Sequence, residues 1–342
     1  MATDTARACQ QLSSRFRPVT NMARLLPRCA PCVGIQKHGL LRKRGLSAAG
    51  FTGCRATLRL DKSNEQSAGD DAPSIHCSGR TVKVPTGSSP RAGRYALAVM
   101  VKAPRSGEVK TRLVPPLRAE EASLLSACFV KDILANLLAV SESQPVDCYA
   151  AYSPHGSEAL FRDFLPQQVG MLPPRSIGLA DSLPDAIEDL IARGYEGACL
   201  VNADSPTLPG SVLVDALTGL RAAGDRVVLG PATDGGYYLI GLKHAHRQLF
   251  RDIDWSTERV YRQTAEQAAG IGLELVTLPA WYDVDDEISL GWLAQELFSG
   301  RRPPQCLREG YPAAHTREYL RRLMTAGAER PGVKYLLEPA AR

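Results

Sequence analysis

The chain has 342 residues, of which 44% are hydrophobic and 23% charged, a composition typical of a soluble globular protein with one large core or two modest ones. Its net charge of +5 is uneven: residues 1–92 hold 15 Lys and Arg against five Asp and Glu, which leaves 26 basic and 31 acidic residues for the rest. The positive charge lies outside the part with regular patterning, which argues against a nucleic-acid partner. Charged residues or Pro interrupt every apolar stretch before the roughly 18 residues of a membrane span, so we expect none.

The chain divides into three regions. Residues 1–92 show no sustained helical or strand period and are rich in Ser and Arg, which predicts a disordered extension. The four cysteines beyond this extension are dispersed, which fits a reducing compartment, so the predicted location is cytoplasmic. The alternative is an organelle, because the composition of the extension resembles an organellar transit peptide. Residues 93–300 are predicted to form the folded domain, and residues 301–342 a peripheral helical tail.

From residue 94 onward, short apolar runs alternate with amphipathic stretches. Residues 95–101 are all apolar, as in a strand buried on both faces, and 119–140 has apolar residues at helical spacing. Further strands are predicted at 146–152, 198–203, 226–230 and 273–278. Further helices are predicted from Asp181 or Ser182 to before Gly194, at 211–223, from Thr257 to 269, and at 287–298. This alternation predicts an α/β fold, a three-layer sandwich with a mostly parallel sheet.

The segment after the first predicted strand is rich in cations. It contains Lys102, Arg105, Lys110, Thr111 and Arg112 around a Gly-containing turn. Lys as a point charge and Arg as a two-pronged donor suit the binding of phosphates, although the segment matches neither the Walker loop nor the G-x-G-x-x-G motif. The alternative is a solvated basic loop. Its place at the carboxyl end of a strand, where ligands bind in open α/β sheets, favours the phosphate site.

Three acidic segments also follow predicted strands. Asp204 comes directly after 198–203, where it could bind a metal or cap the next helix. Asp234, Gly235 and Gly236 precede two tyrosines, a pattern typical either of close backbone approach to a ligand or of a plain hairpin turn.

The last acidic segment, 283–287, holds four acids in five residues. Helix capping accounts for Asp286 and Glu287 but not for Asp283 and Asp285. With Asp204, these carboxylates offer a site for Mg²⁺ or Mn²⁺, and we select Asp204 and Asp285 as the candidate ligands.

Five motifs in register resemble a known family over about residues 95–298. They are Pro104-x-x-Gly107-x-x-Lys110-Thr111-Arg112-Leu113, Asp204-Ser205-Pro206, Asp234-Gly235-Gly236-Tyr237, Asp254-Trp255-Ser256-Thr257 and Asp283-Val284-Asp285. Together they resemble the bacterial radical-SAM/selenodomain-associated transferases, which are regarded as glycosyltransferase-A-type enzymes with a nucleotide-diphospho-sugar transferase fold. A more distant similarity is to nucleotidyltransferases that make activated sugars.

The resemblance implies a nucleotide or nucleotide-sugar donor and a small-molecule acceptor. Donor phosphates would be bound by Lys102, Lys110, Thr111, Arg112, Gly235 and Gly236, with Asp204 and Asp285 on the metal. Lys110 and Asp234 are the candidate catalytic residues. Glycosyl transfer is the first hypothesis, nucleotidyl transfer to a phosphorylated or acidic small molecule is the second, and a catalytically silent binding module of the same fold is the third.

Overall fold

The computed structural model describes residues 75–77, 80–82 and 91–326. The predicted extension at 1–92 and the end of the predicted tail lie almost wholly outside these residues. Within 75–82, strand β1 (Ile75–Cys77) pairs antiparallel with β2 (Arg80–Val82). The remaining elements, from residue 95 onward, form the domain in which every candidate site residue lies.

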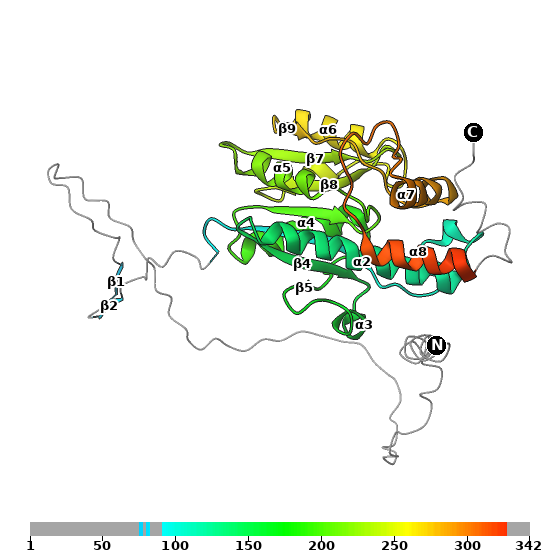
Figure 1. Cartoon of the computed structure of the whole chain (residues 1–342). Helices are drawn as coiled ribbons and strands as arrows, with labels where there is room; N and C mark the ends of the chain where they lie inside the picture. The colour runs from blue at the N-terminus through cyan, green and yellow to red at the C-terminus, as the bar shows by residue number, and fades with distance from the viewer. Residues whose placement is uncertain (1–74, 78–79, 83–90, 327–342) are drawn as a thin grey trace, which may run out of the picture. The chain divides into compact units, whose positions relative to one another are not determined.

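A seven-stranded mixed sheet forms the centre of this domain (Figure 1). Its strands are β3 (Tyr95–Lys102), β4 (Val146–Ser153), β5 (Gly170–Leu172), β6 (Ala198–Asn202), β7 (Arg226–Pro231), β8 (Tyr237–Leu242) and β9 (Glu274–Thr277), in the order β5-β4-β3-β6-β8-β7-β9. Strand β8 runs antiparallel to β6 and β7, and the other pairings are parallel. The predicted fold, an α/β sandwich with a mostly parallel sheet, is confirmed.

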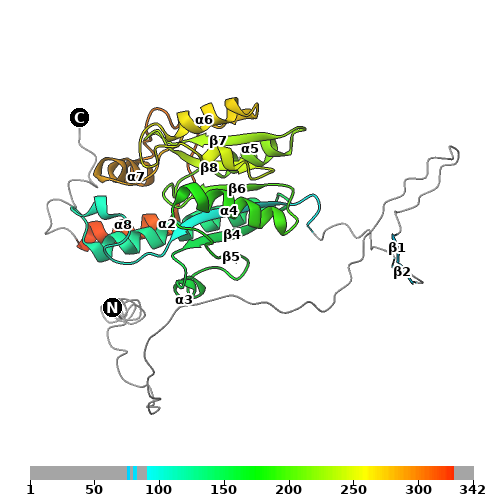
Figure 2. The same ribbon diagram turned by 180° about the vertical axis from the view of Figure 1, so that it is seen from behind.

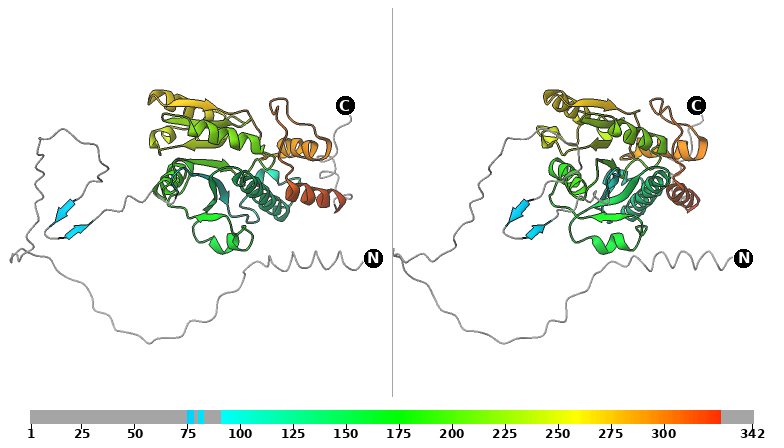
Figure 3. Two further views of the ribbon diagram at one scale, coloured as in Figure 1. Left: turned by 60° about the vertical axis from the view of Figure 1, so that its left-hand side comes forward. Right: turned by 90° about the vertical axis from the view of Figure 1, so that its left-hand side faces the viewer.

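Helices cover both faces of the sheet (Figures 1, 2 and 3). They are α2 (Ala119–Ser141), α3 (Glu158–Arg162), α4 (Leu179–Ala192), α5 (Gly210–Arg221), α6 (Val260–Gly270), α7 (Glu287–Ser299) and α8 (Ala314–Ala326), with the short 3-10 helices η1 (Thr111–Leu113) and η2 (Arg247–Phe250). In β3, Leu97 and Val99 face a core with α2, α5, α7 and α8, whereas Ala96 and Ala98 face a core with α4, α6 and η2. This alternation explains why the strand is apolar throughout.

Helix α2 is long and apolar enough, by length and composition, to cross a membrane, although the sequence led us to expect no such segment. It packs instead as a core helix: its buried Asn136 donates a hydrogen bond to Leu208 O at 2.7 Å. Its buried Asp132 accepts hydrogen bonds from the backbone N–H groups of His315 (3.0 Å) and Thr316 (2.7 Å). Asp132 thus caps α8, which lies alongside α2 (Figure 1). The tail helix is thereby joined to the core.

Two helix starts differ from the predictions. Helix α4 begins after Gly178 rather than at Asp181 or Ser182, and α6 begins after Arg259 rather than at Thr257. The hydroxyls of the predicted caps make loop contacts instead: Ser182 donates to Ser176 O, and Thr257 donates to Asp254 O. Thr257 therefore lies in the turn before α6, and Ser182 lies in the first turn of α4 and bonds back to the preceding loop, since these side chains hydrogen-bond in turns as well as at caps.

The strand directions place one edge of the sheet under the candidate site. All seven strands except β8 run the same way, so their carboxyl ends share an edge, and β8 begins at that edge. The loops after β3, β6 and β7 and the segment after β9 all leave from it. These are the four segments with the predicted site residues.

Candidate active site

Lys110 is held in place by the loop that follows β3. The neighbouring side chains of Val109 and Leu113 are buried and anchor the loop to the core. Lys110 itself has a left-handed backbone (φ 49°, ψ 39°) at the start of η1. Its side chain is only 6% exposed, and its ammonium lies 5.5 Å from the centroid of the Phe129 ring. The cation therefore points inward rather than into solvent.

The ammonium of Lys110 contacts both acidic segments that the sequence assigned to a metal. Its Nζ lies 2.5 Å from Oδ1 of Asp204 and 2.8 Å from Oδ1 of Asp285, and donates to Val284 O at 2.7 Å. An ammonium has three hydrogens to donate, so these contacts satisfy it. Burial alone would lower the pKa of Lys110, but the charges of Asp204 and Asp285 outweigh it and raise the pKa above its usual value. Lys110 stays charged at neutral pH.

Two further contacts join the segment after β6 to the segment after β9. The backbone N–H of Val284 donates to Asp204 O at 2.9 Å. Below this link, the Thr207 hydroxyl donates to the Tyr282 hydroxyl, which donates to the buried carboxylate of Glu296 on α7. These buried hydrogen bonds fix the spacing of the two segments, and with it the positions of Asp204 and its partner carboxylates.

The loop between β7 and β8 provides the third acidic segment. Ala232 forms a parallel bridge with Trp281, and the N–H of Thr233 donates to Trp281 O at 3.0 Å. This pairing places Asp234 beside the segment after β9. The N–H of Gly236 donates to Oδ1 of Asp234 at 2.8 Å and orients its carboxylate. The predicted alternative of a hairpin turn is confirmed for the backbone between β7 and β8. This turn places Asp234 beside the segment after β9.

Gly235 allows this turn to pack against the start of α6. Its φ is +91°, a Cβ added there would lie 2.2 Å from Glu258 O, and its carbonyl accepts the N–H of Tyr261 at 2.9 Å. We expect Gly235→Ala to lower the free energy of unfolding by about 2 kcal/mol more than Gly156→Ala. Gly156 also has a positive φ, +83°, but nothing lies within 4 Å of its added Cβ. Urea unfolding of both variants measures the difference, and equal losses would contradict this packing.

Three carboxylates form a cluster next to Lys110. One oxygen each from Asp234, Asp283 and Asp285 lies within 4.8 Å of the others. Burial, and then the charges of Asp234, Asp285 and Asp204, raise the pKa of Asp283 from 3.8 to about 7. The cluster therefore concentrates more negative charge than Lys110 neutralises. Carboxylate oxygens are hard ligands, so the donor set suits Mg²⁺ or Mn²⁺.

The structure brings together the main residues selected from the sequence. Lys110, Asp204 and Asp285 are in direct contact, and Asp234 lies beside Asp285. Asp283 was recognised in the acidic segment but not selected as a ligand. Its spacing of two from Asp285 in an extended segment was the available signal, because alternate residues of such a segment share a side.

The other cations of the loop after β3 lie at its surface. Lys102 is exposed and donates to Glu108 O at 2.8 Å, within its own loop. Thr111 and Arg112 are exposed in η1, one and two residues beyond Lys110. Their role in phosphate binding stays a prediction.

Asp286 acts as the N-cap of α7, as the capping interpretation required. Its carboxylate accepts the backbone N–H of Ser289 at 2.8 Å. That hydrogen bond is the largest cause of a lowered pKa of Asp286, and the nearby charge of Arg112 lowers it further. Asp286 thus belongs to the helix terminus, and Asp283 and Asp285 remain for the site.

Comparison with known proteins agrees with this architecture. Residues 136–257 match the family DUF2064, "Uncharacterized protein conserved in bacteria". A structure from Desulfovibrio desulfuricans G20 described as a "putative nucleotide-diphospho-sugar transferase" is similar at 29% identity and a TM-score of 0.55, covering 66% of this chain and 97% of that chain. No curated protein matches the chain.

Two more distant structures are also similar. CMP:2-keto-3-deoxy-manno-octonic acid synthetase, complexed with CTP, has 12% identity and a TM-score of 0.39, covering 60% of this chain and 100% of that chain. A 4-diphosphocytidyl-2C-methyl-D-erythritol synthase has 12% identity and a TM-score of 0.34, covering 54% of this chain and 86% of that chain. The radical-SAM/selenodomain association stays a prediction. This chain thus has the fold of the nucleotide-diphospho-sugar transferases, and its residues 136–257 match a family conserved in bacteria.

Proposed function

We propose that the domain is a metal-dependent glycosyltransferase that takes a sugar from a nucleotide-activated donor and transfers it to a small-molecule acceptor. The observation that carries the proposal is the meeting of Lys110 with Asp204, Asp234, Asp283 and Asp285 at the carboxyl edge of the sheet. The similarity to a nucleotide-diphospho-sugar transferase over 97% of that chain supports the choice of donor.

The residues of the cluster fit a divalent cation. Asp234, Asp283 and Asp285 are hard oxygen donors. Burial first, and then the charges of the neighbouring carboxylates, raise the pKa of Asp283, and a cation would offset those charges. The two residues selected from the sequence, Asp204 and Asp285, both contact the ammonium of Lys110. We therefore assign Asp285 to both Lys110 and the metal ion, and Asp204 mainly to Lys110. When bound, Mg²⁺ or Mn²⁺ supplies positive charge that offsets the charge of a donor diphosphate.

The protein residues have distinct tasks in this reaction. The acceptor oxygen bonds to the sugar carbon as the bond from that carbon to the diphosphate oxygen breaks, and the nucleoside diphosphate leaves with the electron pair. Lys110 stabilises the charge that grows on the phosphate oxygens. Asp234, which is exposed at the turn, accepts the proton of the acceptor hydroxyl. Lys102, Thr111 and Arg112 extend the phosphate contacts outward.

Nucleotidyl transfer is the second candidate because of the basic loop after β3. A nucleoside triphosphate carries more negative charge than a nucleotide-sugar, and this loop adds surface cations beside Lys110. In that reaction an anionic acceptor attacks the α-phosphorus, and pyrophosphate leaves. The same residues would serve both reactions, so the leaving group distinguishes them.

The test is a panel of nucleotide-sugars and nucleoside triphosphates, each with and without Mg²⁺ or Mn²⁺. We expect thermal stabilisation by a nucleotide-sugar that depends on the metal, and release of a nucleoside diphosphate on turnover. Pyrophosphate release would establish nucleotidyl transfer instead. Absence of both stabilisation and turnover across the panel would leave the binding-module hypothesis in place of either enzyme.

A further inference from the structure

One aspartate and two histidines form a second group of side chains at the opposite edge of the sheet. Asp225 directly precedes β7, and His244 and His246 follow the end of β8. Since β7 and β8 are antiparallel, with Val227 opposite Leu242, the three residues meet at the edge remote from the carboxyl ends of the parallel strands. This group is therefore separate from the acidic cluster around Asp285.

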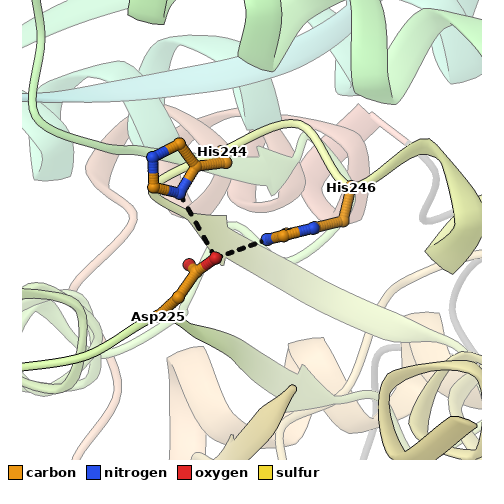
Figure 4. A group of neighbouring side chains, drawn as sticks. All are labelled: Asp225, His244 and His246. Carbon is orange, nitrogen blue, oxygen red and sulfur yellow. Dashed lines mark hydrogen bonds and ion pairs between the residues drawn. The ribbon is translucent and has the colours of Figure 1, made fainter. Parts of the chain in front are cut away.

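The donor atoms of the three side chains converge. His246 Nε2 lies 2.7 Å and His244 Nδ1 3.3 Å from the same Oδ2 of Asp225. Figure 4 shows the two rings approaching this oxygen from different sides, and their planes cross at 73°. In a tetrahedral zinc site with bonds of about 2.0–2.1 Å, neighbouring donor atoms lie about 3.3 Å apart. The distance from His244 to Asp225 matches this spacing, and the distance from His246 to Asp225 would have to open by about 0.6 Å. All three donor atoms lie within 4.8 Å of one another.

The backbone around these residues is already held in place. The N–H of Arg226 donates to Oδ1 of Asp225 at 3.0 Å, which leaves Oδ2 turned toward the rings. Lys243, next to His244, donates through Nζ to Ala222 O at 2.6 Å and to Gly224 O at 2.8 Å. These contacts fasten the loop after β8 to the loop before β7. Such outer hydrogen bonds orient the ligands of metal sites.

We propose that Asp225, His244 and His246 bind a divalent transition-metal ion, with zinc as the expected species. Two imidazoles and one carboxylate form a nitrogen-rich set that suits zinc, whereas Mg²⁺ takes oxygen ligands. The side chain of His244 is 69% exposed, so the ion has access from solvent and keeps a position for water. The bound ion joins the start of β7 to the loop that leads from β8 into η2.

The proposal is tested by zinc titration of the full chain by calorimetry, after removal of metal with a chelator. Residues 1–92 contain cysteines, and the acidic cluster also offers zinc ligands, so the quantity measured is the loss of zinc binding by each variant relative to wild type. We expect Asp225→Asn and His246→Gln each to weaken one zinc site at least about tenfold. Both variants should also lose the part of the zinc-induced rise in melting temperature that comes from binding at this site.

Two control variants complete the experiment. His155→Gln changes an exposed histidine elsewhere, and Asp283→Asn changes the acidic cluster, so both should retain the site. In wild type, Co²⁺ should give the visible absorption of a tetrahedral nitrogen and oxygen site, which His246→Gln removes. Zinc binding and cobalt spectra that are the same in wild type, Asp225→Asn and His246→Gln would overturn the proposal and leave an ordinary Asp–His hydrogen bond.

Discussion

Lys110→Met is expected to lower kcat/KM about 100- to 1000-fold with the donor that the panel identifies, because it removes the buried cation that stabilises the charge of the leaving phosphate. Methionine keeps most of the length of the apolar stem, so the change removes the ammonium, with its contact to the Phe129 ring, and leaves the packing of the stem. The loss also leaves Asp204 and Asp285 without the cation that lies between them. We therefore expect weaker donor binding as well as slower turnover.

Two other variants make this result specific. Lys131→Met changes a partly exposed lysine on α2 outside the site and should leave turnover unchanged. Lys110→Arg keeps the charge, but the guanidinium is larger than the ammonium and the side chain at this position is only 6% exposed. Arginine also cannot reproduce the three contacts of the ammonium. We expect Lys110→Arg to lower kcat/KM at least about tenfold. Wild-type activity in Lys110→Met would remove Lys110 from the catalytic machinery.

The sequence predicted the sheet well because its strands carry a strong local signal. Strands buried on both faces, such as 95–101, are continuous apolar runs, and the helices between them have a clear period. Strand β5 (Gly170–Leu172) and α3 (Glu158–Arg162) were missed, since three or five residues are too few to show a period. Strand β8 (Tyr237–Leu242) was not among the predicted strands and was implied only by the hairpin alternative. The ends of α4 and α6 were displaced because Ser and Thr mark turns as well as caps.

The site was predicted in its parts but not in its contacts. Because the carboxyl ends of parallel strands share an edge, the positions of Lys110, Asp204 and Asp285 after strands were enough to predict that they meet. That Lys110 lies between the two carboxylates depends on the left-handed turn before η1 and on the buried anchors beside it. The partial burial of Asp283 follows from pairing between distant segments. Neither feature has a local signature.

Asp283 should make the stability of the metal-free protein depend on pH. Its pKa is about 7 in the folded state, against 3.8 ordinarily, so between these values the folded state binds a proton that the unfolded state has released. Stability therefore falls as pH rises from about 4 to about 7 and then levels off. Below pH 4 the carboxyl is protonated in both states and this contribution is constant. At about 1.4 kcal/mol for each pKa unit, the fall amounts to about 4–5 kcal/mol.

Asp283→Asn should remove this fall, because asparagine resembles the protonated carboxyl and cannot ionise. We expect the variant to be about 4 kcal/mol more stable than wild type at pH 8 in a chelator, and nearly equal to it at pH 4. Urea unfolding at a series of pH values measures both curves, and Asp181→Asn, at an exposed aspartate on α4, is the matched control. Mg²⁺ or Mn²⁺ should stabilise wild type at pH 8 more than Asp283→Asn, since a cation offsets the negative charge of the ionised Asp283 beside Asp234 and Asp285. Parallel curves of stability against pH for wild type and Asp283→Asn would contradict this prediction. The carboxyl of Asp283 would then ionise as freely in the folded chain as in the unfolded one. The acidic cluster would lack the excess negative charge on which the metal assignment depends.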